Sequence, residues 1–187
     1  MYEAAITPAF SDFLPPWVAR QQWYAGLQTP KLRNLGSYRF QDPAGEVGIE
    51  THLVTDGIAV YQLPMTYRGA PLPGGDNALI ATAVHSRLGD RWIYDAVLDP
   101  VWRAELLRMV ATQGTSDAAS SHRAQARGLR LAEEDLHDAD IELIRVLVRS
   151  AAVAPGAWGA LLGSWIALDG STAEGCLAIV FPRNGSA

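Results

Sequence analysis

The stretch EVGIETHLVTDGIAVYQLPMTYRG, residues 46–69, decides the fold. Every second residue from Val47 to Leu53 is apolar or β-branched, which is typical of a strand with one buried face. The Asp-Gly pair at 56–57 is typical of a type I′ hairpin turn, and the run after it returns as the partner strand. Because proline has no N–H to donate to a ladder, we expect Pro64 to break that second strand.

Further strands are predicted on both sides of this hairpin. LGSYRF at 35–40 precedes it, and ALIATAVHSRLGDRWIYDAV at 78–97 has the pattern of two strands joined near Gly89 and Asp90. GSWIALDGSTAEGCLAIVF at 163–181 closes the chain as a hairpin that turns between Asp169 and Gly175. Strands that follow one another without intervening helices favour an antiparallel sheet.

Three helices are predicted around these strands. SDFLPPWVARQQWYAG at 11–26 predicts about three turns with a cap at Ser11 or Asp12 and a left-handed terminator at Gly26. LDPVWRAELLRMVATQG at 98–114 predicts a second helix, with Asp99 as N-cap and Pro100 at the first helical position. A third is expected over 138–152, after a mobile polar loop at 115–127. The fold class is therefore α+β, with the helices packed on one face of the sheet.

Composition excludes several classes of protein. The 187 residues suit one domain, and 49% hydrophobic with 19% charged residues is typical of a globular chain. The net charge of -5 and the scattered Lys and Arg argue against a nucleic-acid partner. Without a signal-like N-terminus or a long apolar run we expect no membrane partner. The single cysteine, Cys176, fits a cytoplasmic location.

Catalytic chemistry has little support in the sequence. The four histidines have no ligand spacing, so we expect no metal and no other cofactor. Cys176 lies among apolar strand residues, where a buried, unreactive thiol is expected. The acids at 133–142 are explained by the start of the predicted third helix, where the helix dipole favours negative charge. Asp95 has no such explanation, since a carboxylate inside an apolar strand needs solvent or a partner.

Aromatic residues offer a second kind of candidate site. Most of the six tryptophans are expected to fill the core, with Trp23 as the best exception because it follows a helix. We expect Trp23 and Tyr24 mainly to lock the first helix onto the sheet. The alternative is a sugar pocket on the concave sheet, and its candidate ligand- or partner-binding residues are Trp23, Tyr24, Tyr61, Tyr94 and Asp95.

Three short motifs carry a resemblance to a known family. QQWYAG at 21–26, VYQLPMTYRG at 60–69 and WIYDAVLDPVWRAELL at 92–107 resemble, in the same order, motifs in the N-terminal cap domain of actinobacterial maltokinases and related aminosugar kinases. The resemblance spans about residues 10–112. It implies a cystatin-like fold, a curved antiparallel sheet around an N-terminal helix, with the kinase chemistry in a separate lobe.

The resemblance is incomplete in two respects. The family commonly has basic residues where this chain has Gln22 and Leu27. After residue 112 the sequence has no phosphate-covering Gly-rich loop, no catalytic-loop Asp-Asn arrangement and no Asp-Phe-Gly motif. We therefore expect a cap-like domain at 1–112, a flexible loop at 113–127, and a helix and β-hairpin at 128–187 that complete the same domain.

These observations lead to two expectations for function. The first is a non-catalytic, stand-alone cap-like protein that contacts a protein partner, such as an enzyme of α-glucan, trehalose or aminosugar metabolism, or that self-associates. The alternative is a protein that binds a small molecule, either a sugar or a sugar phosphate.

Overall fold

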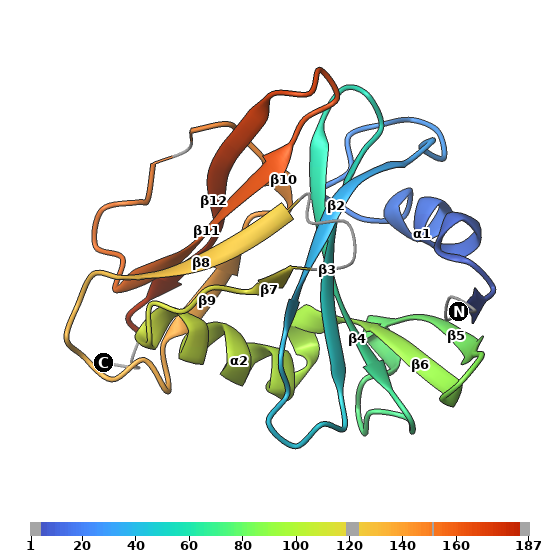
Figure 1. Ribbon diagram of the computed structural model, residues 1–187, viewed down its shortest axis with the longest axis horizontal. Helices are drawn as coiled ribbons and strands as arrows, with labels where there is room; N and C mark the ends of the chain where they lie inside the picture. The colour runs from blue at the N-terminus through green and yellow to red at the C-terminus, as the bar shows by residue number, and fades with distance from the viewer. Residues whose placement is uncertain (1–4, 119–123, 151, 184–187) are drawn as a thin grey trace.

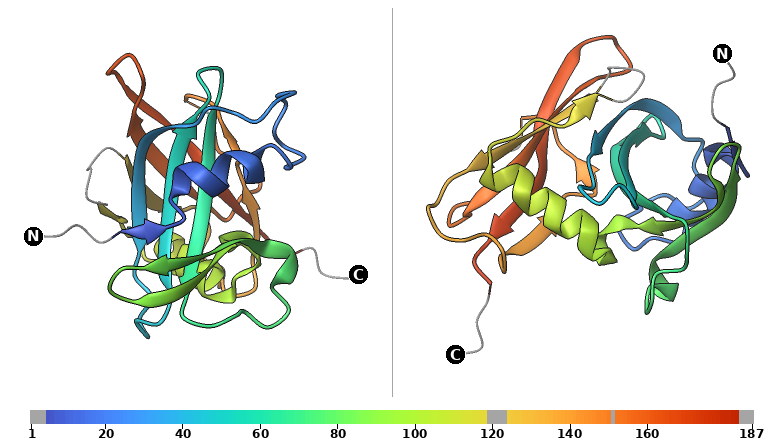
Figure 2. Two further views of the ribbon diagram at one scale, coloured as in Figure 1. Left: turned by 90° about the vertical axis from the view of Figure 1, so that its right-hand side faces the viewer. Right: turned by 60° about the horizontal axis from the view of Figure 1, so that its bottom comes forward.

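Two antiparallel sheets and two α-helices make up the computed structural model, which describes residues 5–118, 124–150 and 152–183 (Figure 1). The larger sheet is strongly curled, and the smaller one packs against it (Figure 2). The predicted α+β class with a curved antiparallel sheet is confirmed. Within the described residues no helix is long and apolar enough to cross a membrane.

The larger sheet contains the predicted hairpins. Its neighbouring strands are, in order, β1 (Ile6–Thr7), β5 (Leu79–His85), β6 (Gly89–Asp95), β4 (Val60–Arg68), β3 (Gly48–Thr55), β2 (Arg33–Phe40) and β7 (Asp117–Ala118). Asp56 and Gly57 lie in the β3–β4 turn as predicted, but the turn is not type I′. Only Gly57 has a positive φ (97°), and the Asp56 carboxylate accepts the N–H groups of Ile58 and Ala59.

The smaller sheet comes from the last third of the chain. Its order is β8 (Ala124–Arg130), β11 (Gly159–Ile166), β12 (Thr172–Phe181) and β9 (Asp140–Leu143). The β11–β12 pair is the predicted C-terminal hairpin, which is therefore confirmed. This sheet shares a core with β2 and β3, so it covers one face of the larger sheet.

Helix α1 (Phe10–Val18) covers the other face, around which the larger sheet curls (Figure 2). Its residues Phe13, Leu14, Trp17 and Val18 are buried, as their spacing predicts. The helix is shorter than expected, since the chain turns away after Val18. Gly26 has no positive φ and is not its terminator.

Helix α2 (Pro100–Ala111) confirms the prediction for its region. Asp99 is the N-cap, with its carboxylate accepting the Val101 N–H at 3.0 Å. The helix packs against β2, β8 and β11, in the angle between the two sheets. The helices thus lie on opposite faces of the larger sheet, and the expectation of one shared face was wrong. A short 3₁₀ helix, η2 (Ala96–Leu98), connects β6 to α2, and another, η1 (Asp76–Ala78), precedes β5.

Strand β4 runs unbroken through Pro64, contrary to the expectation. The Gln62 N–H donates to the Arg145 carbonyl at one edge of β4, and further along the same edge the pairing with β6 starts where Met65 lies opposite Asp95, the last residue of β6. Backbone groups alternate along a strand, so the Pro64 nitrogen faces this edge between the two partners. A missing N–H there costs no ladder bond.

The predicted third helix is wrong. Its region forms β9, then β10 (Val146–Leu147), and then irregular chain. β9 pairs with β12 of the smaller sheet, whereas β10 pairs with β4 of the larger one, so this segment crosses between the sheets. The run is rich in β-branched residues, which favour extended backbone when partner strands are available.

The region 113–127, predicted as a flexible loop, contains strand residues on both sides of residues 119–123. Asp117–Ala118 extends the larger sheet, the Ser116 N–H donates to the Ala126 carbonyl, and β8 begins at Ala124. Residues 119–123 lie outside the described part of the chain.

Gly128 of β8 lies directly against α2, and we expect Gly128→Ala to lower the free energy of unfolding by about 1–3 kcal/mol or more. A Cβ atom there would lie 2.0 Å from the Met109 carbonyl oxygen, so the helix backbone itself would have to move. Urea unfolding measures the change. The matched control is Gly48→Ala on β3, where the nearest atom would lie 3.4 Å away. Equal costs for the two variants would contradict this packing.

Candidate functional site

Three of the predicted site residues form one aromatic cluster. The Tyr61 ring on β4 lies 5.7 Å from Trp23 and 5.8 Å from Tyr24, and Trp23 also packs edge-on against Trp17 of α1 at 6.0 Å. Trp23 therefore links the helix to the sheet, as expected. Its side chain is only partly buried.

Arg145 connects this cluster to a fourth predicted residue, Asp95. The Arg145 guanidinium lies 5.6 Å from the centre of the Trp23 ring and forms an ion pair with Asp95. Both charged side chains are nearly buried, with 12% and 13% exposed. The sequence predicted that Asp95 needs solvent or a partner, and Arg145 is that partner.

Tyr94 lies on the opposite face of the sheet. Successive strand residues point to opposite sides, and its neighbour Ile93 packs in the α1 core together with Tyr61. The Tyr94 hydroxyl instead accepts the Leu72 N–H at 2.9 Å. The structure thus brings four of the five predicted residues together and separates the fifth from them.

Sequence reasoning missed Arg145. It lies within the third helix predicted over 138–152, which gave it no reason to meet Asp95. In the structure it directly precedes β10 and is brought beside Asp95 by the pairing of β10 with β4. The signal that could have found it was the unpaired carboxylate, which required a cation from elsewhere in the chain.

The phenol of Tyr61 is held in its neutral form. Burial raises its pKa, and so does the Asp56 carboxylate, which accepts the hydroxyl hydrogen bond at 2.8 Å. The Tyr24 hydroxyl donates to the Gln28 carbonyl at 3.0 Å. The two hydroxyls of the cluster are therefore already hydrogen-bonded within the chain, and the arrangement is better suited to rigidity than to proton transfer.

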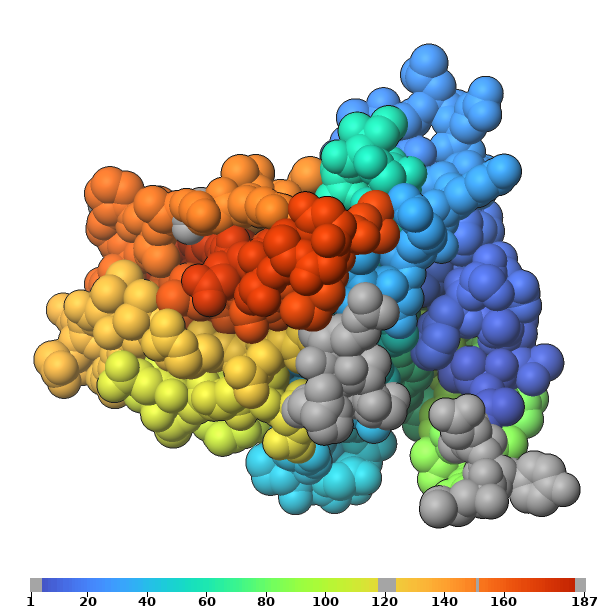
Figure 3. Space-filling model, turned by 45° about the horizontal axis from the view of Figure 1, so that its top comes forward, coloured from blue at the N-terminus to red at the C-terminus, as the bar shows by residue number. Residues whose placement is uncertain are grey.

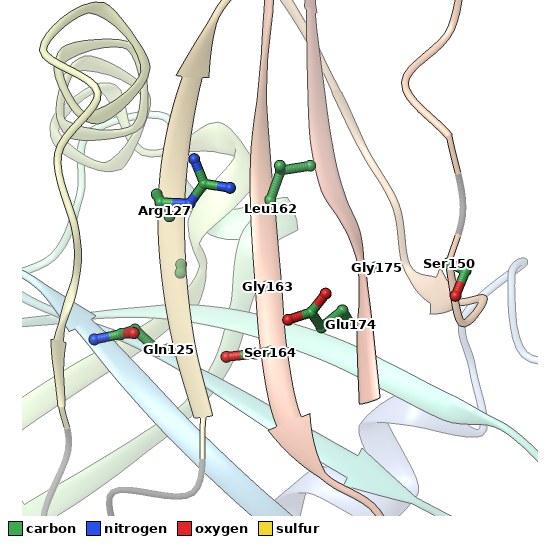
Figure 4. Close-up of a pocket in the computed structure, with 9 residues that line it drawn as sticks. Gln125, Arg127, Ser150, Leu162, Gly163, Ser164, Glu174 and Gly175 are labelled. Atoms are coloured by element: carbon green, nitrogen blue, oxygen red, sulfur yellow. The ribbon is translucent and has the colours of Figure 1, made fainter. Parts of the chain in front are cut away.

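A polar hollow of about 390 Å³ lies elsewhere, on the outer face of the smaller sheet (Figure 4). Gln125, Arg127, Ser164 and Glu174 point into it from three adjacent strands, and Ser150 lies at its side. A second hollow, of about 430 Å³, lies between α2 and the segment 135–138. Neither contains a residue of the predicted site.

The remaining reactive side chains are not arranged for catalysis. Among the described residues no group of three or more His, Cys, Asp or Glu side chains could hold a metal ion. Cys176 is buried as expected, and burial raises the pKa of its thiol. The acids at 133–135 lie in irregular, exposed chain and not at a helix start, so that explanation was wrong.

Comparison with known protein families finds a similarity in the first part of the chain. Residues 17–99 match the family model of the maltokinase N-terminal cap domain. The resemblance that the motifs indicated is confirmed over this range, which is less than half of the chain. It runs from the end of α1 through β2–β6 to the N-cap of α2.

The matched range is a cap-like module related to maltokinase, and the smaller sheet lies outside it. The aromatic cluster and Asp95 belong to the cap module, whereas Arg145 does not. The domain division at residues 112 and 127 and the binding role of the five site residues stay predictions.

His52 of the cap module should make stability depend on pH. It is buried against Phe10, with ring centres 4.8 Å apart, and burial lowers its pKa although Glu50, 3.6 Å away, opposes this and Arg39 adds to it. The unfolded chain then binds the proton more readily. The contribution of neutral His52 to the free energy of unfolding is complete above the unfolded pKa of about 6.5. It falls as the pH drops below that value, by at most about 1.4 kcal/mol per pH unit.

Urea unfolding of the wild type and of His52→Gln at pH 7.5 and 5.5 measures this dependence. The variant should lose much of the difference between the two pH values. His85→Gln, in the less buried β5–β6 hairpin, serves as the control and should retain it. A wild-type free energy that is the same at both pH values would contradict the assignment.

Proposed function

We propose that the chain is a non-catalytic cap-like module that works in the cytoplasm by contacting a protein. The main support is that the chain covers both faces of the larger sheet with its own residues. Helix α1 lies on one face and the smaller sheet lies on the other. Contacts with other molecules are then left to the outer surface, where large aliphatic side chains are exposed.

Under this proposal the chain itself catalyses no reaction. Asp95, the acid with the best case for catalysis, is paired with Arg145. The link to α-glucan, trehalose or aminosugar metabolism rests on the match of residues 17–99 alone. Purified chain incubated with ATP and maltose or glucosamine should transfer no phosphate, and transfer above background would reject the non-catalytic role.

The direct test is binding to purified enzymes of these pathways. Biolayer interferometry with immobilised chain, against a maltokinase, a trehalose synthase and an α-glucan branching enzyme, should show saturable binding to at least one. The denatured chain controls for nonspecific adsorption. If none of the enzymes binds and the chain does not self-associate, the contact role fails.

A second candidate function is binding of a sugar or sugar phosphate, and the polar hollow in Figure 4 favours it. Arg127, Glu174 and Gln125 offer donors and acceptors for hydroxyl or phosphate groups. Calorimetric titration with maltose, trehalose, glucosamine and their phosphates tests this function. Heat that disappears in Arg127→Ala but persists in Trp23→Ala would support binding in the hollow, and no heat would reject it.

A further inference from the structure

Four large aliphatic side chains are exposed on separate connections at one end of the molecule. We call this set the apolar end, and it consists of Leu27 (102% exposed), Ile58 (95%), Val148 (62%) and Leu168 (51%). They lie in the loop after α1, in the β3–β4 turn, after β10, and in the β11–β12 turn. Exposed aliphatic groups gathered in one place mark interaction sites more often than isolated ones do.

Contacts at the base of these connections show that they are neighbours. The loop after α1 touches β4 through Tyr24 and Tyr61, and Tyr61 binds Asp56 of the β3–β4 turn. Leu147 pairs with Val60, which places Val148 beside the same turn.

The segment after β10 is in turn a neighbour of the β11–β12 turn, because the Arg149 guanidinium lies 3.8 Å from Asp169 of that turn. The four connections form a row, with the β3–β4 turn between the loop after α1 and the β11–β12 turn (Figures 1 and 2). Figure 3 shows the loop after α1, the β3–β4 turn and the β11–β12 turn on one face of the molecule.

Charge is distributed unevenly along this row. The segment 19–34, which is the loop after α1 with the first two residues of β2, has three exposed cations, Arg20, Lys31 and Arg33, and no acid, although the whole chain has a net charge of -5. At the other end, the β11–β12 hairpin has the exposed acids Asp169 and Glu174, and Arg149 offsets only part of their charge. One end of the row is therefore basic and the other is acidic.

We propose that a second copy of this chain docks on the apolar end about a two-fold axis near Ile58. In the second copy such an axis reverses the order of the four connections. The basic loop of each copy then faces the acidic hairpin of the other, and the aliphatic side chains of the two copies meet between them. An anionic bilayer would repel Asp169, whereas a second copy offers it the partner's cations. This proposal deepens the proposed function by naming the contacted protein.

Sedimentation velocity over a concentration series tests the contact with purified protein alone. The wild type should form a dimer, and Leu27→Ser/Ile58→Ser should weaken dimerisation by about tenfold or more. The control is Leu88→Ser, which removes an equally large side chain, 59% exposed, in the β5–β6 hairpin. It should leave the dimer unchanged. A wild type that stays monomeric, or a dimer indifferent to both substitutions, would overturn the proposal.

A charge exchange tests the two-fold arrangement itself. Lys31→Glu/Arg33→Glu makes both ends of the row acidic, and Asp169→Asn/Glu174→Lys makes both basic, while Asn keeps an oxygen to accept the Ser171 N–H. Each variant alone should dimerise about tenfold or more weakly than the wild type because like charges then face each other. An equimolar mixture should recover dimerisation, since both junctions of the mixed dimer again join opposite charges. Failure of the mixture would reject the axis.

These outcomes are separate from the test of the proposed function. A monomeric chain that binds one of the enzymes would end the self-association proposal and leave the contact role intact. A dimer that binds none of the enzymes would support the apolar end as the contact surface and remove the link to those enzymes.

Discussion

Replacing Gln62 with leucine should lower the free energy of unfolding by about 3–5 kcal/mol. Gln62 is completely buried, and its amide N–H groups donate to the carbonyls of Ile144 and Leu177, each at 2.8 Å. Its amide oxygen accepts the Tyr38 hydroxyl at 2.9 Å. Leucine has nearly the same size but removes all three hydrogen bonds. The Leu177 carbonyl keeps the Ile144 N–H at 2.9 Å, whereas the Ile144 carbonyl and the Tyr38 hydroxyl each lose a partner, at a desolvation penalty of about 1–3 kcal/mol per group.

Gln62 also connects the two parts of the chain. It lies in the Tyr-Gln-Leu-Pro motif of the cap module, whereas Ile144 and Leu177 belong to the region outside the family match. Burial raises the pKa of the Tyr38 phenol, so its hydroxyl remains a donor at neutral pH. The loss in Gln62→Leu is therefore expected to loosen the smaller sheet from the larger sheet.

Urea unfolding with matched variants tests this assignment. Gln125→Leu makes the same change at an exposed position of β8 and should alter stability by no more than about 0.5 kcal/mol. Adding Tyr38→Phe to Gln62→Leu removes one of the unpaired groups, so the double variant should lose less than the sum of the single losses. If Gln62→Leu costs no more than Gln125→Leu, these hydrogen bonds do not hold the sheets together.

The parts of the fold that were predicted correctly depend on local sequence. The β3–β4 turn, the β11–β12 hairpin and the start of α2 at Asp99 each follow from residues within one turn or one strand pair. The wrong third helix illustrates the opposite case. Residues 140–147 are extended because β12 and β4, far away in the chain, supply their partners. Such tertiary pairing overrides local preference.

The candidate site likewise has residues that the sequence could place and one that it could not. Trp23, Tyr24, Tyr61 and Asp95 share one face of the larger sheet, although their role remains a prediction. Tyr94 could have been excluded from the sequence, because it directly precedes Asp95 on a strand and must point the other way. Arg145 could not have been assigned, since its place beside Asp95 depends on the pairing of β10 with β4.

Asp99→Ala should be as costly as the loss of Gln62, at about 3–5 kcal/mol. The Asp99 side chain is completely buried and forms two hydrogen bonds with the Arg68 guanidinium, each at 2.7 Å, while it also caps α2 through the Val101 N–H. Alanine leaves the Arg68 cation without its counterion in a largely buried place, which is the costly case for a buried pair.

The exposed Asp90→Ala on β6 is the matched control, with an expected change within about 0.5 kcal/mol. Arg68→Met combined with Asp99→Ala removes the stranded cation as well, so the double variant should be more stable than the sum of the single losses predicts. Strict additivity would show that the two side chains contribute independently.

The pH dependence of the same variant separates the ion pair from simple packing. Burial alone would raise the pKa of the Asp99 carboxyl, but the hydrogen bonds from Arg68 and the Val101 N–H, together with the Arg68 charge, outweigh burial and hold the pKa below its usual value. The unfolded chain therefore takes up the proton first. The stabilisation is complete above the unfolded pKa of about 3.9 and is lost as pH falls through the lower folded pKa. Between pH 5 and pH 2 the difference in unfolding free energy between wild type and Asp99→Ala should shrink, whereas a difference that stays constant would mean that the carboxylate charge does not stabilise the junction of β4 and α2.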